Sequence, residues 1–296
     1  MIVLQMSGAT DKKHKRRRNE NMPTNNIHGY HFSHNEVEPF YQGKRTAHAV
    51  PLSDAAFLRL FGIEYETEYM NGYSVDLNAI AGELREALGG RLKCETDASL
   101  SGGFECISYP ATFGCHMSCY GWKQFFEVLN RHSPTTRGAG MHIHVSRASL
   151  GQTDEARDLC IAKLVYILDN CNRTLAKLAG RNYTNMHYCA CNGANIEKTD
   201  KSAVAVYKAK RTNDTRYRAL NLTNEHTIEF RIFAVDYNYS HFLARIQLVN
   251  WLIDYCKSHT FTDVYELTTA KIKKAINELG DNYSELKALY AEVVSA

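Results

Sequence analysis

The sequence has no long apolar run and no glycine-rich phosphate loop, and each absence excludes a class of protein. No stretch approaches the roughly 20 consecutive apolar residues that a membrane-spanning helix needs, so no membrane partner is expected. The first residues hold no apolar signal region. Neither GxGxxG nor GxxxxGK[ST] follows a predicted strand, which argues against dinucleotide-binding and P-loop folds.

A recognisable covalent nucleophile is also missing, because no Ser-His-Asp or Cys-His pattern stands out. The nine cysteines are odd in number and scattered through core-like segments. This pattern favours free thiols in a reducing cytoplasm over a disulfide framework, so we expect a cytoplasmic protein. Cys115-x3-Cys119 and Cys189-x-Cys191, with His116 and His187 close by, could hold zinc, although their spacings fit no strong zinc template.

The net charge of +3 is unevenly placed, because Lys12–Arg18 alone supplies six positive charges in seven residues. This run lies in a polar, Asn-rich segment that lacks helical or strand periodicity. Residues 1–50 are therefore predicted to be a disordered leader, and 51–296 a catalytic domain with C-terminal helices. The basic run has two readings, contact with a polyanion and a solvated tail, and the sequence leaves both open.

Three segments alternate charged or imidazole side chains with core residues. Because successive side chains of a strand point to opposite faces, each segment places its polar row on one face. Carboxylates so close together repel each other unless a cation lies among them. The segments are 61–68 with Glu64, Glu66 and Glu68, 140–145 with His142 and His144, and 227–233 with Glu229 and Arg231.

These rows predict a site for hard divalent ions. Glu105 adds a carboxylate in the similar segment 103–108. Several carboxylates with an imidazole suit Mg²⁺ or Mn²⁺ better than zinc, and two such ions could bridge the phosphates of ATP. Arg211, Arg216 and Arg218 offer guanidinium groups that could bind the same phosphates.

The remaining patterns predict an α+β fold with a mainly antiparallel sheet, because regular βαβ alternation is absent. The predicted helices are 74–88 with Ser74 as N-cap, 120–132, 153–179 and three within 239–295. The predicted strands, besides 61–68 and 140–145, are 91–97, 104–109, 202–208, 216–221 and 227–235. The polar segment 181–200 is predicted to be a loop that covers a site.

As a set, the motifs resemble the amidoligase family of phage and bacterial type, within the glutamine synthetase and glutamate–cysteine ligase superfamily of carboxylate–amine ligases. The resemblance covers residues 60–250, and Cys106 departs from the aliphatic residue common there. The motifs are Gly62-x-Glu64-x-Glu66, Asp97-x-Ser99-Leu100, Gly103-x-Glu105-x-Ile107-Ser108-x-Pro110, Gly140-x-His142-Ile143-His144-Val145, Arg216-Tyr217-x-x-Leu220-Asn221 and Thr227-Ile228-Glu229-Phe230-Arg231-x-Phe233.

The resemblance implies a curved antiparallel sheet with helices on one side, as in the glutamine synthetase catalytic domain, holding ATP and two Mg²⁺ or Mn²⁺ ions. One ion would be bound by Glu66, Glu105 and His142, and the other by Glu64 and Glu229. His144 would approach the nucleotide phosphates. Arg231 would bind the transferred phosphate or a substrate carboxylate, Arg218 would stabilise the phosphoryl group, and Asp97 would receive or deprotonate the attacking amine.

The reaction implied by this resemblance joins a carboxylate to an amine. The carboxylate attacks the γ-phosphate of ATP to give an acyl phosphate and ADP. The amine then attacks the acyl carbon, forms the amide and expels phosphate. The substrates could be free amino acids, peptides or cell-wall fragments. Three alternatives remain open: a guanidino kinase on the same fold, a nucleic-acid-binding protein that uses the basic leader, and a metal hydrolase that uses His142 and His144.

Overall fold

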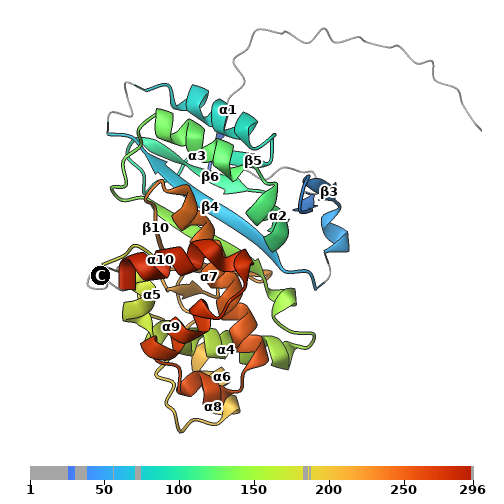
Figure 1. The fold of residues 1–296 in the computed structure, drawn as a ribbon, viewed down its shortest axis with the longest axis vertical. Helices are drawn as coiled ribbons and strands as arrows, with labels where there is room; N and C mark the ends of the chain where they lie inside the picture. The colour runs from blue at the N-terminus through green and yellow to red at the C-terminus, as the bar shows by residue number, and fades with distance from the viewer. Residues whose placement is uncertain are drawn as a thin grey trace, which may run out of the picture.

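The computed structural model describes residues 26–30, 39–55, 57–70, 75–182, 186 and 188–294. These residues form a curled ten-stranded sheet with helices, which confirms the predicted α+β class (Figure 1). The central strand is β4 (Leu60–Glu68), as the alternation in 61–68 predicts. It pairs with β8 (Gly140–Ser146) on one side and with β6 (Gly103–Ser108) and β7 (Ala111–Thr112) on the other.

The sheet extends outward from these central strands as a half-barrel. Beyond β6 lie β5 (Leu92–Glu95) and β1 (Ile27–His28), and beyond β7 lie β2 (Phe40–Gln42) and β3 (His48–Val50). On the other side, β8 is followed by β10 (Thr227–Ala234) and β9 (Leu220–Asn221). All pairings are antiparallel except β1–β5 and β2–β7, so the sheet is mainly antiparallel, as predicted.

The boundary predicted at residue 50 needs correction, because β1, β2 and β3 lie within the proposed leader and belong to the sheet. Sequence patterns miss them because strands of two or three residues are too short to show a period. Their geometry comes from non-local pairing, for example Ile27 with Cys94 across β1 and β5. The basic run Lys12–Arg18 lies outside the described residues.

Helices pack on one face of the sheet through an aromatic core. Figure 1 shows α1 (Leu77–Ala87) and α3 (Trp122–Arg131) lying across the sheet. The fully buried ring of Tyr65 on β4 meets Phe126 of α3 at 5.5 Å and Phe242 of α7 (Tyr239–Ser258) at 5.8 Å between centroids. Asp76 caps α1 through a bond from the Ala79 amide; the predicted cap, Ser74, lies outside the described residues.

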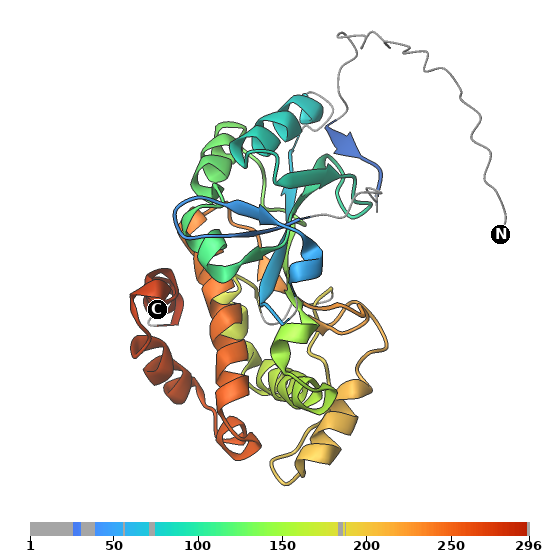
Figure 2. The ribbon, with the colours of Figure 1, turned by 90° about the vertical axis from the view of Figure 1, so that its right-hand side faces the viewer.

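Figure 2 shows the C-terminal helices beside α7. The predicted helix 153–179 is two helices that meet at Cys171, and the C-terminal region holds four α-helices, including α7, instead of three. The elements are α2 (Phe113–Ser118), which was not predicted, α4 (Asp154–Asn170), α5 (Asn172–Leu178), α6 (Ser202–Lys210), α8 (Phe261–Tyr265), α9 (Thr269–Asn277) and α10 (Ser284–Val294), with short 3₁₀ turns at Leu52–Asp54, Arg147–Leu150 and Asp281–Tyr283.

Two predicted strands differ from the structure. Residues 202–208 alternate like a strand, yet they form α6, whose buried residues Ala205 and Ala209 lie one helical turn apart. Tertiary packing therefore overrides a short local pattern. Of 216–221, only β9 is a strand. No helix in the described part of the chain combines the length and apolar character that crossing a membrane requires.

His116 of α2 is a structural histidine. Its ring stacks on Tyr120 and Trp122, with centroids 4.8 and 5.9 Å away. Nδ1 accepts the indole N–H of Trp122 at 3.0 Å, so in the neutral ring Nε2 carries the proton and donates it to the Phe61 carbonyl at 3.0 Å. Both nitrogens are engaged, which speaks against the zinc reading for this Cys-His cluster. Burial lowers the pKa of His116 to about 4.

Acid is therefore expected to destabilise the protein through His116. The unfolded chain binds a proton near pH 6.5 and the folded chain only near pH 4, so this contribution is complete above pH 6.5 and is lost as the pH falls to 4. The loss should reach about 3 kcal/mol in the free energy of urea unfolding. His116→Gln keeps a donor and an acceptor but cannot titrate, so its stability should fall less over this window. Parallel curves for both proteins would contradict the assignment.

Candidate functional site

The sheet register brings the predicted polar rows together on the face opposite the aromatic core. Glu64 of β4 pairs with His142 of β8, and Glu66 pairs with Glu105 of β6. His144 pairs with Glu229 of β10. Directly paired residues share a face and lie about 5 Å apart, so residues distant in sequence form one cluster.

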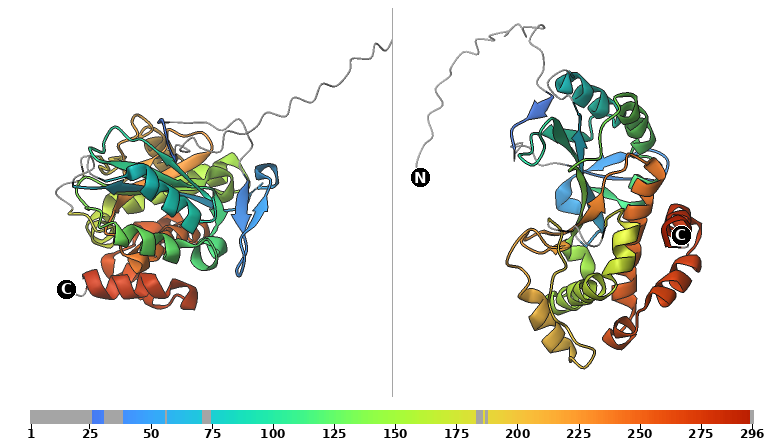
Figure 3. Two further views of the ribbon diagram at one scale, coloured as in Figure 1. Left: turned by 90° about the horizontal axis from the view of Figure 1, so that it is seen from above. Right: turned by 90° about the vertical axis from the view of Figure 1, so that its left-hand side faces the viewer.

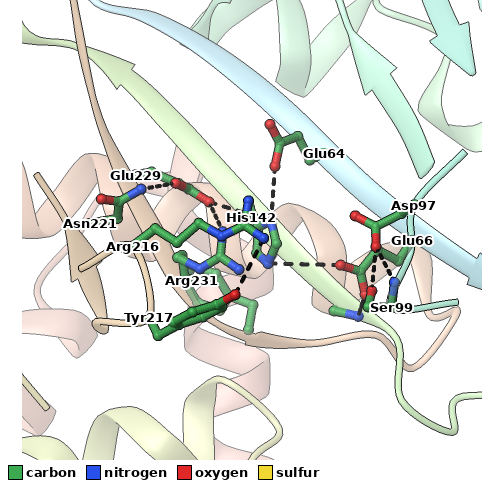
Figure 4. Close-up of polar contacts among 12 residues, drawn as sticks. Glu64, Glu66, Asp97, Ser99, His142, Arg216, Tyr217, Asn221, Glu229 and Arg231 are labelled. Atoms are coloured by element: carbon green, nitrogen blue, oxygen red, sulfur yellow. Dashed lines mark hydrogen bonds and ion pairs between the residues drawn. The ribbon is translucent and has the colours of Figure 1, made fainter. Parts of the chain in front are cut away.

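His142 lies at the centre of this cluster, which Figure 4 shows. Its Nδ1 is 2.9 Å from Oε2 of Glu64 and 3.4 Å from Oε1 of Glu229. Its Nε2 is 4.0 Å from Oε1 of Glu66, on the opposite side of the ring. His144 reaches the same carboxylates, with Nε2 2.9 Å from Oε1 of Glu64. The two imidazoles therefore lie among carboxylates from β4 and β10.

Three overlapping groups in this cluster have ligand atoms that all lie within 4.8 Å of one another. All five predicted metal ligands occur in these groups, together with His144 and Asp97. The groups are Glu64 with His144 and Glu229, Glu64 with Glu105 and His142, and Glu66 with Asp97 and Glu105. The family resemblance places Glu66 with Glu105 and His142. In the structure, Glu66 instead groups with Asp97 and Glu105, and Glu64 belongs to two groups.

The carboxylates of the cluster differ in their electrostatics. Burial, followed by repulsion from Glu64 and Glu66, raises the pKa of Glu105 to about 10. Burial also raises the pKa of Glu66. Burial acts the same way on Glu64, but the nearby imidazoles of His144 and His142 outweigh it and lower the Glu64 pKa well below its usual value. The imidazoles therefore compensate the negative charge of Glu64, whereas the neighbours that act on Glu105 are carboxylates, which carry no compensating positive charge.

The residues present fit divalent cations. Glu66, Glu105 and Glu229 are almost fully buried, and carboxylates in such a position need a cation or protons. Nε2 of His144 is buried without a hydrogen bond, although it lies beside Glu64. Oxygen donors with few nitrogen donors match Mg²⁺ and Mn²⁺.

Arg231 and Asn221 hold Glu229 from two sides. Nη1 of Arg231 binds Oε1 of Glu229, and the Asn221 amide donates to Oε2. The buried Nε of Arg231 has no hydrogen-bond partner. Arg231 therefore lies at the cluster, as the sequence predicts, and retains a donor for a ligand. Asn221 belongs to one of the sequence motifs, but the motif alone indicates no role for it.

The other three predicted arginines lie in different surroundings. Arg218 is ion-paired with Asp214 at 2.8 Å. Arg216 meets the hydroxyl groups of Tyr30 and Tyr217 at 3.0 and 3.4 Å, and Arg211 lies over an exposed tyrosine ring. Among the described residues, no ion pair or hydrogen bond joins these three guanidinium groups to the cluster carboxylates. In the projection of Figure 4, Arg216 lies beside Arg231.

The structure adds residues that sequence reasoning missed. Glu95 pairs with Glu105, and His28 pairs with Glu95, so the row of Glu66 and Glu105 continues across β5 and β1. Glu95 is almost fully buried. The alternation of Leu92 and Cys94 with Lys93 and Glu95 was a usable signal for this row.

Glu68 does not belong to the metal-capable groups of the described residues; its carboxylate stabilises a loop. Its carboxylate accepts the backbone N–H groups of Ser101 and Gly102 at 3.1 and 2.7 Å. It thereby holds the β5–β6 loop that contains Asp97 and Ser99. Asp97 in turn accepts both the amide and the hydroxyl of Ser99 at 2.6 Å. These bonds fix the loop that brings Asp97 to the cluster.

Two glycines of the motifs allow close approaches at the site. A Cβ on Gly103 would lie 1.7 Å from the Thr67 carbonyl oxygen, so only glycine fits there. The amide of Gly140 donates to Oε2 of Glu66. A Cβ on Gly140 would lie 3.2 Å from Nη2 of Arg181 and 3.4 Å from Oε2 of Glu66. The crowding at Gly140 places Arg181, from the predicted covering loop, beside the cluster.

Comparisons with known proteins do not identify a family for this chain. No family model matches the chain, and no curated protein matches it. Among solved structures, apo GmaS without ligand matches with 12% identity and a TM-score of 0.38, covering 88% of this chain and 94% of that chain. A TM-score this low carries no argument about common fold or activity. The functional case therefore rests on the site itself.

Proposed function

We propose that the protein is an ATP-dependent carboxylate–amine ligase that forms an amide or peptide-type bond. The observation that carries the proposal is the cluster on β4, β6, β8 and β10, with three groups of metal-capable atoms and a guanidinium at its side. The motif resemblance to the amidoligases and to the glutamine synthetase superfamily agrees with it. Two Mg²⁺ or Mn²⁺ ions would neutralise the charge of the ATP phosphates when bound.

The protein residues would orient the reactants in this scheme. The metal ligands would be Glu64, Glu66, Glu105, His142 and Glu229, with His144 toward the phosphates. Arg231, through its unused buried Nε, would bind the transferring phosphate or the substrate carboxylate. After the carboxylate forms an acyl phosphate, Asp97 on its fixed loop would receive the amine proton. Arg218 could join only after leaving Asp214.

Phosphate release from ATP tests this proposal when it is screened against libraries of carboxylates and amines. An amide product that appears with stoichiometric ADP and phosphate is the expected result. The guanidino kinase alternative, which uses the same fold, would instead yield a phosphoguanidine and no free phosphate. A product of that kind would contradict the ligase assignment.

His142→Ala should lower metal-dependent ATP turnover at least about 100-fold, because the His142 ring lies within 4.0 Å of the carboxylates of Glu64, Glu66 and Glu229. Far-UV circular dichroism should show an unchanged fold. His132→Ala is a matched control, because the His132 side chain binds the surface residue Glu83 at 3.2 Å and, within the described part of the chain, no residue of the cluster. Full activity in His142→Ala would remove the cluster from the mechanism.

A further inference from the structure

A side-chain contact joins two distant edges of the half-barrel. Nη1 of Arg216 donates to the hydroxyl of Tyr30 at 3.0 Å, across 186 positions of sequence. Tyr30 follows β1 by two residues, and Arg216 precedes β9 by four. Strands β5, β6, β4, β8 and β10 lie between β1 and β9 in the sheet. A flat sheet would separate these edge strands by roughly 30 Å, so only its curl brings them together.

The contact lies on the cluster side of the sheet. Aromatic residues and helices fill the opposite side. Pairing of β1 with β5 continues through a 2.9 Å bond from the Thr96 amide to the His28 carbonyl, which leads the chain toward Asp97 of the cluster. Figures 2 and 3 agree that β1 and the gold-to-orange segment before β9 are on one side of the molecule, away from α9 and α10.

Arg216 retains its charge for a ligand. Its described partners are neutral: the Tyr30 hydroxyl, the Tyr217 hydroxyl at 3.4 Å and the Tyr217 ring at 5.2 Å. By contrast, Arg218 and Arg231 are ion-paired with carboxylates. A guanidinium held only by neutral groups can bind an oxyanion without first losing a carboxylate partner.

The segment that carries Tyr30 is anchored to the catalytic domain. The Asn26 amide donates to Oδ1 of Asn78 in α1 at 2.6 Å, and the Asn26 side chain donates to the Asn78 carbonyl at 3.1 Å. Pairing of Ile27 and His28 with β5 adds a second attachment. The Tyr30 hydroxyl therefore extends from a fixed backbone, which suits a group that positions another side chain.

We propose that residues 26–30 complete the active site and that Tyr30 is a positioning residue, which holds Arg216 toward phosphate oxygens of a ligand on the metal cluster. This inference rests on the proposed function, because it takes the cluster to bind a metal–phosphate complex. It gives an N-terminal segment outside the motif-bearing region a part in ligand binding.

The test measures binding of Mn²⁺–tripolyphosphate to the full chain by calorimetry. Arg216→Gln should weaken binding about tenfold and Tyr30→Phe about fivefold, since each removes part of a charge-assisted contact. The double variant should bind no more weakly than Arg216→Gln, because Tyr30 acts through Arg216. Arg131→Gln is the control: Arg131 is exposed on α3, where it pairs with Glu83 at 3.1 Å, and its loss should leave the affinity unchanged.

The outcomes separate this inference from the proposed function. If Tyr30→Phe binds as tightly as the unmodified protein, or if only its melting temperature changes, the role of Tyr30 is overturned and the ligase proposal stands. Additive losses in the double variant would also overturn it, because they would mean that Tyr30 acts independently of Arg216. If the unmodified protein does not bind Mn²⁺–tripolyphosphate, both the inference and the proposed ATP site are wrong.

Discussion

Replacing Glu105 by glutamine is expected to reduce metal-dependent ATP turnover at least about 100-fold and to stabilise the metal-free protein. Glu105 belongs to two of the three metal-capable groups, so its loss affects both. Without metal, the same carboxylate is a liability, because burial and neighbouring carboxylates raise its pKa to about 10. At neutral pH the folded protein must keep this carboxyl group protonated, whereas the unfolded chain releases the proton. A glutamine amide removes that cost because it is neutral in both states, while it preserves size and shape.

The stabilisation should depend on pH in a defined direction. In the unmodified protein, the unfolded chain releases the Glu105 proton near pH 4.5 and the folded chain only near pH 10. The folded state is therefore favoured most below pH 4.5 and loses this advantage as the pH rises toward 10. At pH 7, Glu105→Gln should gain about 1–3 kcal/mol in unfolding free energy, measured with a chelator present.

Glu127→Gln, an exposed change on α3, is the matched control and should alter neither activity nor stability measurably. A Glu105→Gln protein that is inactive and less stable than the unmodified protein would indicate a structural role instead. Such a result would mean that Glu105 is held by partners that compensate its charge. Unchanged activity would exclude Glu105 as a metal ligand.

Mn²⁺ is expected to stabilise the chelator-treated protein strongly. A ligand at 100 times its dissociation constant that binds only the folded state adds about 2.7 kcal/mol for each site, so two sites would add about 5 kcal/mol. The physical reason is that the cations neutralise buried carboxylates that otherwise repel each other. Urea unfolding at increasing Mn²⁺ concentrations measures the effect, and excess chelator should reverse it.

Glu66→Gln should remove about half of this stabilisation. Glu66 groups with Asp97 and Glu105, whereas the group of Glu64, His144 and Glu229 does not include it. One site should therefore survive the change, and a calorimetric titration should show one Mn²⁺ per chain in place of two. Complete loss of Mn²⁺ binding would mean that a single shared site exists, and no change would place Glu66 outside both sites.

Local patterns reveal the strands that carry the site, because alternation over six or more residues is visible in the sequence. The strands β4, β8 and β10 were predicted from it, and pairing aligns their polar rows. Similar alternation in 202–208 predicted a strand, and this prediction was wrong. The segment forms helix α6, in which Ala205 and Ala209 are buried one turn apart. The strands β1, β2 and β3 carry too few residues to show any period.

The sequence by itself determined the α+β class and a cluster built from alternating carboxylates and imidazoles, because strand periodicity is a local property of the chain. Only the tertiary structure decided how this cluster is divided: Asp97 joins Glu66, Glu68 turns to hold a loop, and Arg218 pairs with Asp214. It also decided that Tyr30 meets Arg216. These choices depend on strand register and sheet curl, which arise from pairings between distant residues and leave no short-range signal.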